Sequence, residues 1–319
     1  MTLEQIKDLL RDMGVVGAGG AGFPSYAKLS PNAETVILNC AECEPLLKVH
    51  RQVLEEYTYE ILSALADIVK TTGAKQGIIG IKEHYSSTLA AINAEIVDFP
   101  ALSVHTLESV YPAGDEVILI KEVTGKTVAP GALPISEGVI VCNVESVYNV
   151  YRAMKGYPVT DKFVTVAGEV KNPMTLRVPL GTKISQLIAK AGGVTTEAPE
   201  YICGGPMMGK AIANMDATTV KGSSSLLYLT AEQTVRGVES ACIRCGKCAE
   251  ACPMGLEPFL LQKYARNNMM DELEENAIQD CIECGCCLYS CPANIPLLDI
   301  IRIAKGDVIR IIRGRTAKK

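Results

Sequence analysis

The chain has 319 residues, of which 48% are hydrophobic and 21% charged, and its formal net charge is −5 at pH 7. This length predicts about two or three domains, and the acidic balance argues against nucleic acid as a general partner. There is no run of about 18 apolar residues, and the first residues lack the basic start and apolar stretch of a signal peptide. The 13 cysteines fit a reducing compartment, so we expect a cytoplasmic protein without a membrane span.

A cluster of glycines lies near the N-terminus, in the stretch GVVGAGGAGFP of residues 14–24. Glycines have no Cβ, so they allow backbone N–H groups to approach a phosphate closely. The spacing matches neither the G-x-G-x-x-G dinucleotide turn nor a P-loop. For this cluster taken by itself, a tight structural turn is the alternative interpretation.

Residues 1–155 alternate strand-like and helix-like segments. Short buried strands are predicted at residues 34–39, 76–81 and 138–143. A helix is predicted over residues 50–71, because apolar side chains, including Leu54 and Ile61, recur about one turn apart. This alternation predicts an α/β domain with a largely parallel sheet.

Residues 160–195 have a different character. Two strands are predicted at residues 163–170 and 175–180, separated by a turn at Asn172 and Pro173. A helix is predicted over residues 183–191, which Gly192 and Gly193 end. Two strands followed by a helix predict a small α+β module. A further helical pattern occurs at residues 257–280, inside a cysteine-rich region.

One cysteine spacing occurs twice near the C-terminus, as C-x2-C-x2-C-x3-C-P. This bacterial ferredoxin pattern binds two [4Fe–4S] clusters, and the fourth cysteine of each run ligates the other cluster. Zinc sites use pairs of C-x2-C instead, and disulfides need an oxidising compartment. The pattern predicts one cluster on Cys242, Cys245, Cys248 and Cys291, and the other on Cys281, Cys284, Cys287 and Cys252.

The remaining cysteines lie outside this ligand pattern. Cys40 and Cys43 form a C-x2-C, for which a redox-active pair and a third metal site with Cys142 and Cys203 are alternatives. Packing beside a cofactor is the favoured interpretation. Cys286 lies inside the second run and is expected to be a non-ligand. The three histidines have no metal spacing, so they are expected to be packed or surface residues.

Several segments together resemble a known family. The stretch GAGGAGFPSYAK at residues 17–28 resembles the flavin-binding loop of the FMN-carrying subunit of respiratory complex I, and equally that of the C subunit of the Rnf electron-transport complex. NCAECEP at 39–45, YPAGDE at 111–116 and NVES at 143–146 agree in the same order. Residues 162–194 resemble the β-grasp module of both families. GGPMMG at 204–209 and the doubled cysteine run are similar to the Rnf protein, so the resemblance covers nearly the whole chain.

The resemblance implies that FMN and a nicotinamide nucleotide share one site. The loop glycines would wrap the FMN phosphate and the nucleotide, and Lys28 would neutralise phosphate charge. Asn39 and Asn143 would hydrogen-bond the flavin, and Phe23 would stack on a ring. Three carboxylates would line the nicotinamide side: Glu44, Asp115 and Glu116. The full implied set of cofactor-binding residues is Gly17, Gly19, Gly20, Gly22, Phe23, Lys28, Asn39, Glu42, Glu44, Tyr111, Gly114, Asp115, Glu116 and Asn143.

The chain also departs from these families. The complex I protein has an arginine at the position of Ala18, an aspartate at that of Ala41, and a second aromatic residue at Leu29 or Ser30. These departures concern the nucleotide pocket more than the flavin pocket. The chain is expected to lack the N-terminal barrel-like domain and long C-terminal tail of the Rnf protein. In this respect it is similar to the cobalamin reductase of propanediol microcompartments or to Rnf-like subunits of soluble redox complexes.

The expected fold class is α/β with additional modules. Residues 1–158 would form an FMN- and NADH-binding α/β domain, and residues 159–238 a β-grasp module with a return segment. Residues 239–305 would form a helical two-[4Fe–4S] ferredoxin-type domain, and residues 306–319 a basic tail. The basic end is expected to supply docking charge from Arg310, Arg313, Arg315, Lys318 and Lys319.

The expected function is that of an NADH:acceptor oxidoreductase. NADH would reduce FMN, and electrons would leave singly through the clusters to a ferredoxin, a corrinoid protein or a reductase complex within a hetero-oligomer. One alternative is an electron relay with FMN and clusters that binds no nicotinamide. Another is a structural adaptor whose flavin pocket is empty. The residues name neither the terminal acceptor nor the direction of electron flow, and they do not distinguish NADH from NADPH.

Overall fold

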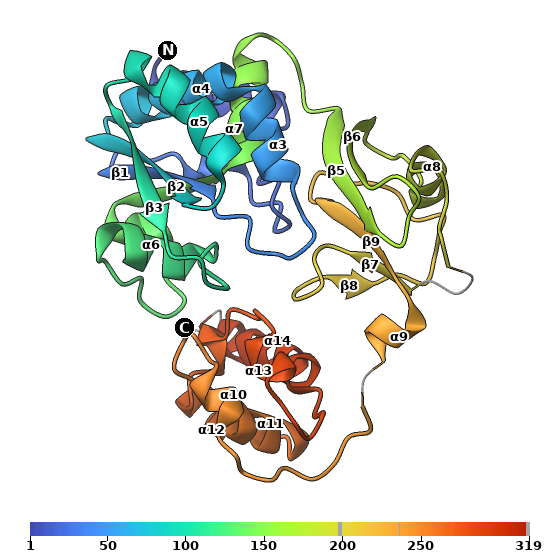
Figure 1. Cartoon of the computed structure of the whole chain (residues 1–319). Helices are drawn as coiled ribbons and strands as arrows, with labels where there is room; N and C mark the ends of the chain where they lie inside the picture. Colours follow the sequence, from blue (N-terminus) through green and yellow to red (C-terminus); the bar gives the residue numbers. More distant parts are fainter. Residues whose placement is uncertain (197–199, 236, 317–319) are drawn as a thin grey trace. The chain divides into compact units, whose positions relative to one another are not determined.

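The computed structural model describes residues 1–196, 200–235 and 237–316, and it divides into two compact units (Figure 1). The first, here called the large unit, comprises Met1–Val128 and Ala132–Gln233. The second, the cysteine-rich unit, comprises Ala129–Gly131 and Thr234–Lys319. The large unit contains two separate sheets.

The first sheet of the large unit is wholly parallel, which confirms the prediction of a largely parallel sheet. Its strand order is β3-β2-β1-β4. The predicted strands at 34–39, 76–81 and 138–143 are confirmed, and β3 lies at an edge of the sheet where no strand was predicted. The bounds are β1 Thr35–Cys40, β2 Gln76–Lys82, β3 Leu102–Leu107 and β4 Val139–Asn143.

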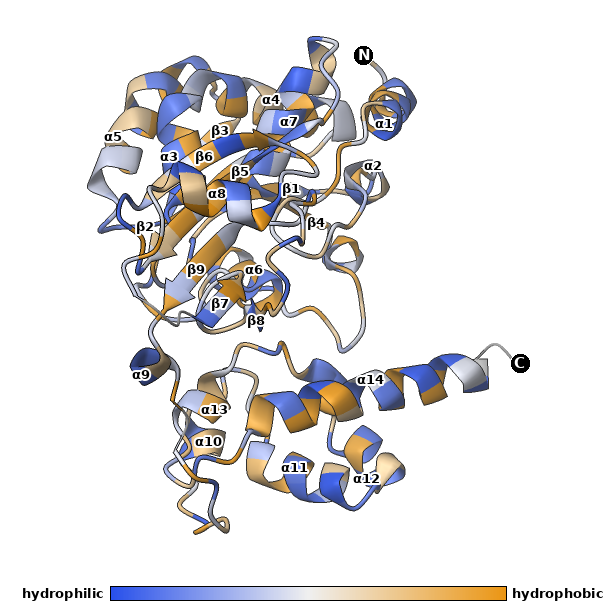
Figure 2. Ribbon diagram, turned by 90° about the vertical axis from the view of Figure 1, so that its right-hand side faces the viewer, coloured by the Kyte–Doolittle hydropathy of each residue, from blue (hydrophilic) through white to orange (hydrophobic). Residues whose placement is uncertain are grey.

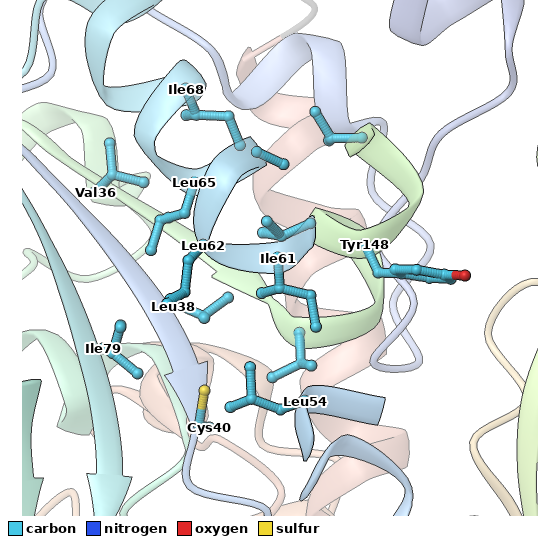
Figure 3. Close-up of a cluster of buried hydrophobic side chains, with 14 of the residues drawn as sticks. Val36, Leu38, Cys40, Leu54, Ile61, Leu62, Leu65, Ile68, Ile79 and Tyr148 are labelled. Carbon is cyan, nitrogen blue, oxygen red and sulfur yellow. The ribbon is translucent and has the colours of Figure 1, made fainter. Parts of the chain in front are cut away.

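Helices cover both faces of this sheet (Figure 1). Side chains alternate along a strand, so Val36 and Leu38 of β1 face one core and Ile37 faces the other. In the larger core, Ile61 and Leu65 pack among the strand residues (Figure 3). The helices of the larger core are α1 Leu3–Asp12, α3 Val49–Glu56, α4 Thr58–Thr72, α5 Ser86–Glu95 and α7 Val144–Met154, and that of the smaller core is α6 Glu116–Thr124. Short elements complete this part: α2 Ser25–Lys28 and the 3-10 turns Ile96–Asp98 and Pro134–Glu137.

The prediction of one helix over residues 50–71 is wrong, because the segment forms two helices that meet at Tyr57. The backbone of Tyr57 has φ −126° and ψ 40°, outside the helical region. Its ring packs against Tyr148, with centroids 4.4 Å apart, and against Phe163 at 6.0 Å. The hydroxyl of Thr58 donates to the carbonyl oxygen of Leu54 at 2.6 Å across the break. Tertiary packing of the aromatic ring therefore overrides an apolar periodicity that runs through the break.

The second sheet of the large unit is mixed, with the order β6-β5-β9-β7-β8. Strands β5 and β6 form an antiparallel hairpin, and β9 pairs with β5 in parallel. Helix α8 packs Ile184 and Leu187 on this sheet, so the predicted strand–turn–strand–helix order is confirmed. The bounds are β5 Asp161–Gly168, β6 Met174–Pro179, α8 Ile184–Lys190, β7 Glu200–Cys203, β8 Lys210–Ala211, β9 Ser225–Leu229 and α9 Ala231–Thr234.

The cysteine-rich unit is helical. The predicted helical pattern at 257–280 consists of two helices and a 3-10 turn, packed through Leu261, Leu273 and Ile278. Residues 306–316 continue the last helix, which has polar and apolar faces (Figure 2) and buries Val308. The bounds are α10 Lys247–Glu250, α11 Pro258–Arg266, α12 Met270–Glu275, the turn Ile278–Asp280, α13 Cys286–Tyr289 and α14 Leu297–Thr316.

Among the helices of the described ranges, none combines the length and the apolarity that crossing a bilayer requires.

Candidate functional site

The motifs of the large unit meet at the carboxyl ends of β1 and β4. Strand order reverses at this point, and open α/β sheets bind their ligands beyond such a reversal. Asn39 and Asn143 are register partners there. Asn39 donates from Nδ2 to the carbonyl oxygen of Gly114 at 2.8 Å, and the backbone N–H of Ala18 donates to Oγ of Ser146 at 2.9 Å. Segments 14–24, 39–45, 111–116 and 143–146 are therefore brought together.

The glycine-rich loop has a shape suited to an anion. The N–H of Gly17 donates to the carbonyl oxygen of Phe23 at 2.8 Å, which closes the loop. Gly20 and Gly22 have φ +120° and +65°, and neither has an atom within 4 Å of where a Cβ would lie. Within the described part of the chain, no acceptor faces the backbone N–H groups of Gly19, Gly20, Ala21 and Gly22. Consecutive free N–H groups of this kind form a concavity for a phosphate.

Lys28 lies beside this loop, at the end of α2. Its ammonium donates to the carbonyl oxygen of Val141 at 3.0 Å and to Oε1 of Glu116 at 3.2 Å. It also lies 5.9 Å from the centroid of the Phe23 ring. The structure thus places a cation, a carboxylate and an exposed aromatic ring together near the loop.

Both asparagines are oriented by protein groups. Oδ1 of Asn143 accepts from the N–H groups of Glu145 at 3.0 Å and Ser146 at 3.4 Å, which caps α7. Nδ2 of Asn143 lies 2.9 Å from Nε2 of His50. Burial lowers the pKa of His50, so a neutral imidazole accepts at Nε2 from this amide. The asparagine side chains are pre-set before any cofactor binds.

Three of the implied cofactor-binding carboxylates bind backbone N–H groups of the protein, and two of them do so at helix starts. Glu42 is 2% exposed at its side chain and accepts from the N–H groups of His50 and Arg51 at 2.8 and 3.2 Å, in the first turn of α3. Asp115 caps α6 by accepting from the N–H of Val117 at 2.9 Å. Burial raises the pKa of Asp115. Glu42 and Asp115 therefore stabilise helix starts.

Glu44, the third of these carboxylates, connects the two sheets of the large unit. Its carboxylate accepts from the N–H groups of Met207 at 3.0 Å and Met208 at 2.8 Å. A Cβ on Gly205 would collide with the Glu44 side chain. Burial raises the pKa of Glu44. The GGPMMG loop is thus held against the loop that follows β1.

The cysteines beyond the ferredoxin runs are engaged in packing and hydrogen bonding. Cys40 lies in the larger core. The thiol of Cys43 accepts from the N–H of Gly114 at 2.9 Å, and burial raises its pKa. Tyr111 precedes this turn and forms a cis peptide bond with Pro112. In the residues that the structure describes, no three histidine, cysteine or acidic side chains converge on a point that would hold one metal ion.

The eight cysteines predicted as cluster ligands line two separate cavities. The first cavity is lined by Cys242, Cys245, Cys248 and Cys291, and the second by Cys252, Cys281, Cys284 and Cys287. Each cavity thus takes three cysteines from one run and the fourth from the other, which is the grouping that the crossed pattern predicts.

The two cysteine loops have matching backbones. Arg244 and Glu283 occupy equivalent positions with φ +58° and +57°, and Gly246 and Gly285 follow with φ +78° and +82°. Each glycine is the N-cap of the short helix that carries the third cysteine, α10 or α13. The repeat in sequence is therefore a repeat in conformation.

The cavity walls suit an iron–sulfur cubane. Apolar side chains, including Phe259 and Ile295 in one cavity and Leu261 and Ile301 in the other, surround the thiols. A cubane is wider than a single ion, so its ligands surround a cavity. Burial raises the pKa of Cys287 to about 12, and iron binding would displace the thiol proton. Cys286 also lines the second cavity.

Comparison with known protein families matches three regions of the chain. Residues 10–152 match the Nuo51 FMN-binding domain, residues 163–211 the SLBB domain, and residues 234–292 a 4Fe-4S dicluster domain. Together with the fold and the two cysteine-lined cavities, these matches place the chain in the class of FMN and iron–sulfur electron-transfer subunits of oxidoreductases.

Individual relatives define the family. The chain is 37% identical over 315 residues to the C subunit of the Na(+)-translocating ferredoxin:NAD(+) oxidoreductase complex of Acetobacterium woodii, covering 97% of this chain and 71% of the relative. The chain belongs to the family of the Rnf C subunits. It is also 42% identical over 267 residues to cobalamin reductase PduS of Citrobacter freundii. That match covers 79% of this chain and 58% of the relative, so the chain spans less than two thirds of the cobalamin reductase.

The fold also occurs in a solved structure, NAD+-reducing [NiFe]-hydrogenase in the H2-reduced state. The two share 19% sequence identity with a TM-score of 0.65, over 94% of this chain and 61% of the hydrogenase chain.

Proposed function

We propose that this chain oxidises NADH at the site beyond β1 and β4 and passes the electrons to a partner redox protein through its cysteine-rich unit. When bound, FMN supplies two-electron chemistry with NADH, and the two [4Fe–4S] clusters supply one-electron transfer. The observation that carries the proposal is the crossed grouping of the eight predicted ligand cysteines around two cavities. In the other unit, the N–H groups at the strand-order reversal have no acceptor among the described residues.

The residues of the large unit would hold the flavin in defined ways. The N–H groups of Gly19, Gly20 and Gly22 would bind its phosphate, because no protein acceptor competes for them in the described part of the chain. Lys28 would balance the phosphate charge. Asn39 and Asn143, already oriented by protein hydrogen bonds, would bind the ring system without a further loss of side-chain entropy.

NADH as donor is supported by the names of relatives, which include ferredoxin:NAD(+) oxidoreductase complexes. Glu116, one of the implied nicotinamide-side carboxylates, forms a side-chain ion pair with Lys28. The test is anaerobic titration of the full chain, loaded with FMN and iron, with NADH and separately with NADPH. Bleaching of the flavin absorbance by NADH supports the proposal, and failure of both nucleotides overturns it.

A relay without nicotinamide is the second candidate, and one observation favours it. Glu42, Glu44 and Asp115 all accept backbone N–H groups, so their carboxylates are committed to the fold. Under this alternative, a reduced ferredoxin would bleach the flavin in the same titration while NADH and NADPH would not.

The partner is proposed to be a separate redox protein within a hetero-oligomer. Relatives are subunits of ferredoxin-dependent complexes and a cobalamin reductase, so a ferredoxin and a corrinoid protein are the acceptors to compare. Of the basic residues expected to supply docking charge, Arg310 pairs with Asp307, and Arg315 with Asp271 and Glu274. Arg313 is exposed on α14, and Lys318 and Lys319 lie outside the described residues.

A further inference from the structure

Lys162 is a fully buried charge at the boundary of two domains. It lies in β5, between the residues matched by the FMN-binding domain and those matched by the SLBB domain. Its ammonium forms an ion pair with Glu145 of α7, and both side chains are 1% exposed. The other oxygen of Glu145 accepts from the N–H of Phe163 at 3.2 Å. The pair thus joins the first sheet's last helix to the second sheet's first strand.

The same ammonium holds the glycine-rich loop. Nζ of Lys162 donates to the carbonyl oxygen of Ala18 at 3.1 Å. On the other side, the N–H of Ala18 donates to Oγ of Ser146 at 2.9 Å. Ala18 is 2% exposed, so this buried residue anchors the loop at both of its backbone polar groups, directly before the exposed Gly19 and Gly20.

Two further contacts reach the loop from the segment that precedes β9. Lys221 donates to the carbonyl oxygen of Gly14. Gly222 approaches so closely that a Cβ there would lie 2.8 Å from the carbonyl oxygen of Gly20. The β-grasp part of the large unit therefore contacts the loop at three of its residues.

The hydrogen bond from Lys162 to Ala18 sets the direction of the backbone N–H of Gly19, which is proposed to bind phosphate. A trans peptide is planar, so its carbonyl oxygen and its N–H point in opposite directions. Because the carbonyl oxygen of Ala18 is turned inward to Lys162, the N–H of Gly19 in the same peptide is turned outward. Rotation of this peptide would turn that N–H away from the open face of the loop.

We propose that the Lys162–Glu145 pair positions the glycine-rich loop, so that the β-grasp part supplies a positioning residue for the flavin site. The inference rests on the proposed function for the identity of the ligand, FMN. The inference about the structure itself is that Lys162, which lies outside the residues matched by the FMN-binding domain, fixes the orientation of the Ala18–Gly19 peptide.

A neutral double variant separates positioning from folding. Removing one partner of a buried ion pair leaves an uncompensated charge, whereas replacing both is often neutral for stability. Lys162→Met combined with Glu145→Gln removes both charges and keeps an acceptor for the N–H of Phe163. The matched control is Arg152→Met, which removes an ion pair between the same two elements, Arg152 to Asp161 at 2.7 Å. Asp161 retains Arg177 at 2.9 Å in that control.

Two measurements on the full chain decide the matter. In protein without flavin, amide hydrogen exchange of the peptide covering residues 14–24 should be faster in the double variant than in Arg152→Met. After addition of FMN, the dissociation constant should rise roughly 10- to 100-fold in the double variant, the factor that corresponds to losing a charge-assisted hydrogen bond. The visible circular dichroism of residual bound flavin should shift, while the melting temperature and iron content should match those of the control.

The outcomes distinguish the inference from the proposed function. Equal loop exchange in the double variant and the control overturns the inference, even where FMN binds. Faster exchange with unchanged FMN affinity also overturns it, because the loop position would then not matter to the flavin. Faster exchange in the double variant, together with a wild type that binds no FMN, supports the positioning of the loop and overturns the proposed function.

Discussion

The carboxylate of Glu44 occupies the space that a side chain on Gly205 would need. Glu44 follows the first strand of the parallel sheet, and Gly205 lies in the GGPMMG loop that follows β7 of the mixed sheet. Two backbone N–H groups of that loop, from Met207 and Met208, bind the carboxylate. The loop after β1 and the loop after β7 are thus held together by the Glu44 hydrogen bonds and by close packing at Gly205, a contact here called the Glu44 latch.

Gly205→Ala should open this latch. The added methyl group collides with the Glu44 side chain, and overpacking of this kind costs about 1–3 kcal/mol. We expect a lower melting temperature and loss of protection from hydrogen exchange at residues 204–209. Gly306→Ala, at an open position of α14, is the control and should not lower the melting temperature. Equal melting temperatures for the two variants would contradict the latch.

The stability of the large unit should depend on pH through Glu44 and Asp115. Burial raises both pKa values, so the folded chain binds these protons more tightly than the unfolded chain. Their contribution is therefore most favourable at low pH and falls as pH rises from about 4 through the raised folded-state values. Glu44→Gln should flatten the melting temperature across this window. A curve that stays parallel to that of the wild type would show that Glu44 does not titrate in this way.

Gly20→Val should release FMN while iron content stays normal. A β-branched residue is strained at φ +120°, and its side chain would fill the face of the loop proposed for the phosphate. Gly73→Val is the matched control, since Gly73 also has positive φ and open surroundings but ends α4. Both variants should lose about 1–2 kcal/mol of stability, and only Gly20→Val should lose flavin fluorescence quenching. Equal flavin binding by both would remove the loop from the flavin site.

Cysteine variants should fall into two spectroscopic groups. The wild type should hold about eight irons as two cubanes, and Cys291→Ala should lose roughly half of them. Since Cys291 lines a cavity with Cys245, the electron paramagnetic resonance spectrum of reduced Cys291→Ala should match that of Cys245→Ala. Cys252→Ala should match Cys284→Ala, and Cys286→Ala should keep both signals. A match between Cys291→Ala and Cys284→Ala would falsify the crossed assignment.

Glu116→Gln should weaken NADH use without emptying the flavin site. Its ion pair with Lys28 is partly exposed, with side chains 42% and 30% accessible, so folding should tolerate the change within about 1 kcal/mol. We expect KM for NADH to rise several-fold in dye reduction, with flavin content unchanged. Lys75→Met, which removes another exposed ion pair, with Glu34, should leave KM unchanged. A KM that does not move in Glu116→Gln would place NADH elsewhere.

The parallel sheet was predictable wherever hydrophobicity was continuous. Strands β1, β2 and β4 are buried along most of their length, and their apolar runs are clear in the sequence. Strand β3 lies at the sheet edge and interrupts its apolar residues with polar ones such as Ser103 and His105, so it lacks the continuous apolar run of the other three strands. The break at Tyr57 depends on two aromatic partners from other elements, which local periodicity does not contain.

The sequence motifs of the candidate site could be recognised in advance, but most contacts between residues far apart in the sequence could not. Local signals were available for some roles. Asp115 lies two residues before an apolar run, as an N-cap can. The contact of Glu44 with a loop far away in the sequence had no local signal. Lys162 had none either, since a lysine in a strand is ordinarily an exposed residue.

The crossed sharing of cysteines has a consequence for assembly during synthesis. A ribosome that has released only the first run has produced three thiols of one cavity and the lone fourth thiol of the other. Neither cavity then has its complete set, so a half-made chain offers iron no finished binding site. The second cavity is complete once Cys287 emerges, and the first only with Cys291. We therefore expect cluster insertion to wait for synthesis of the second run, and a chain truncated after the first run to mature neither centre.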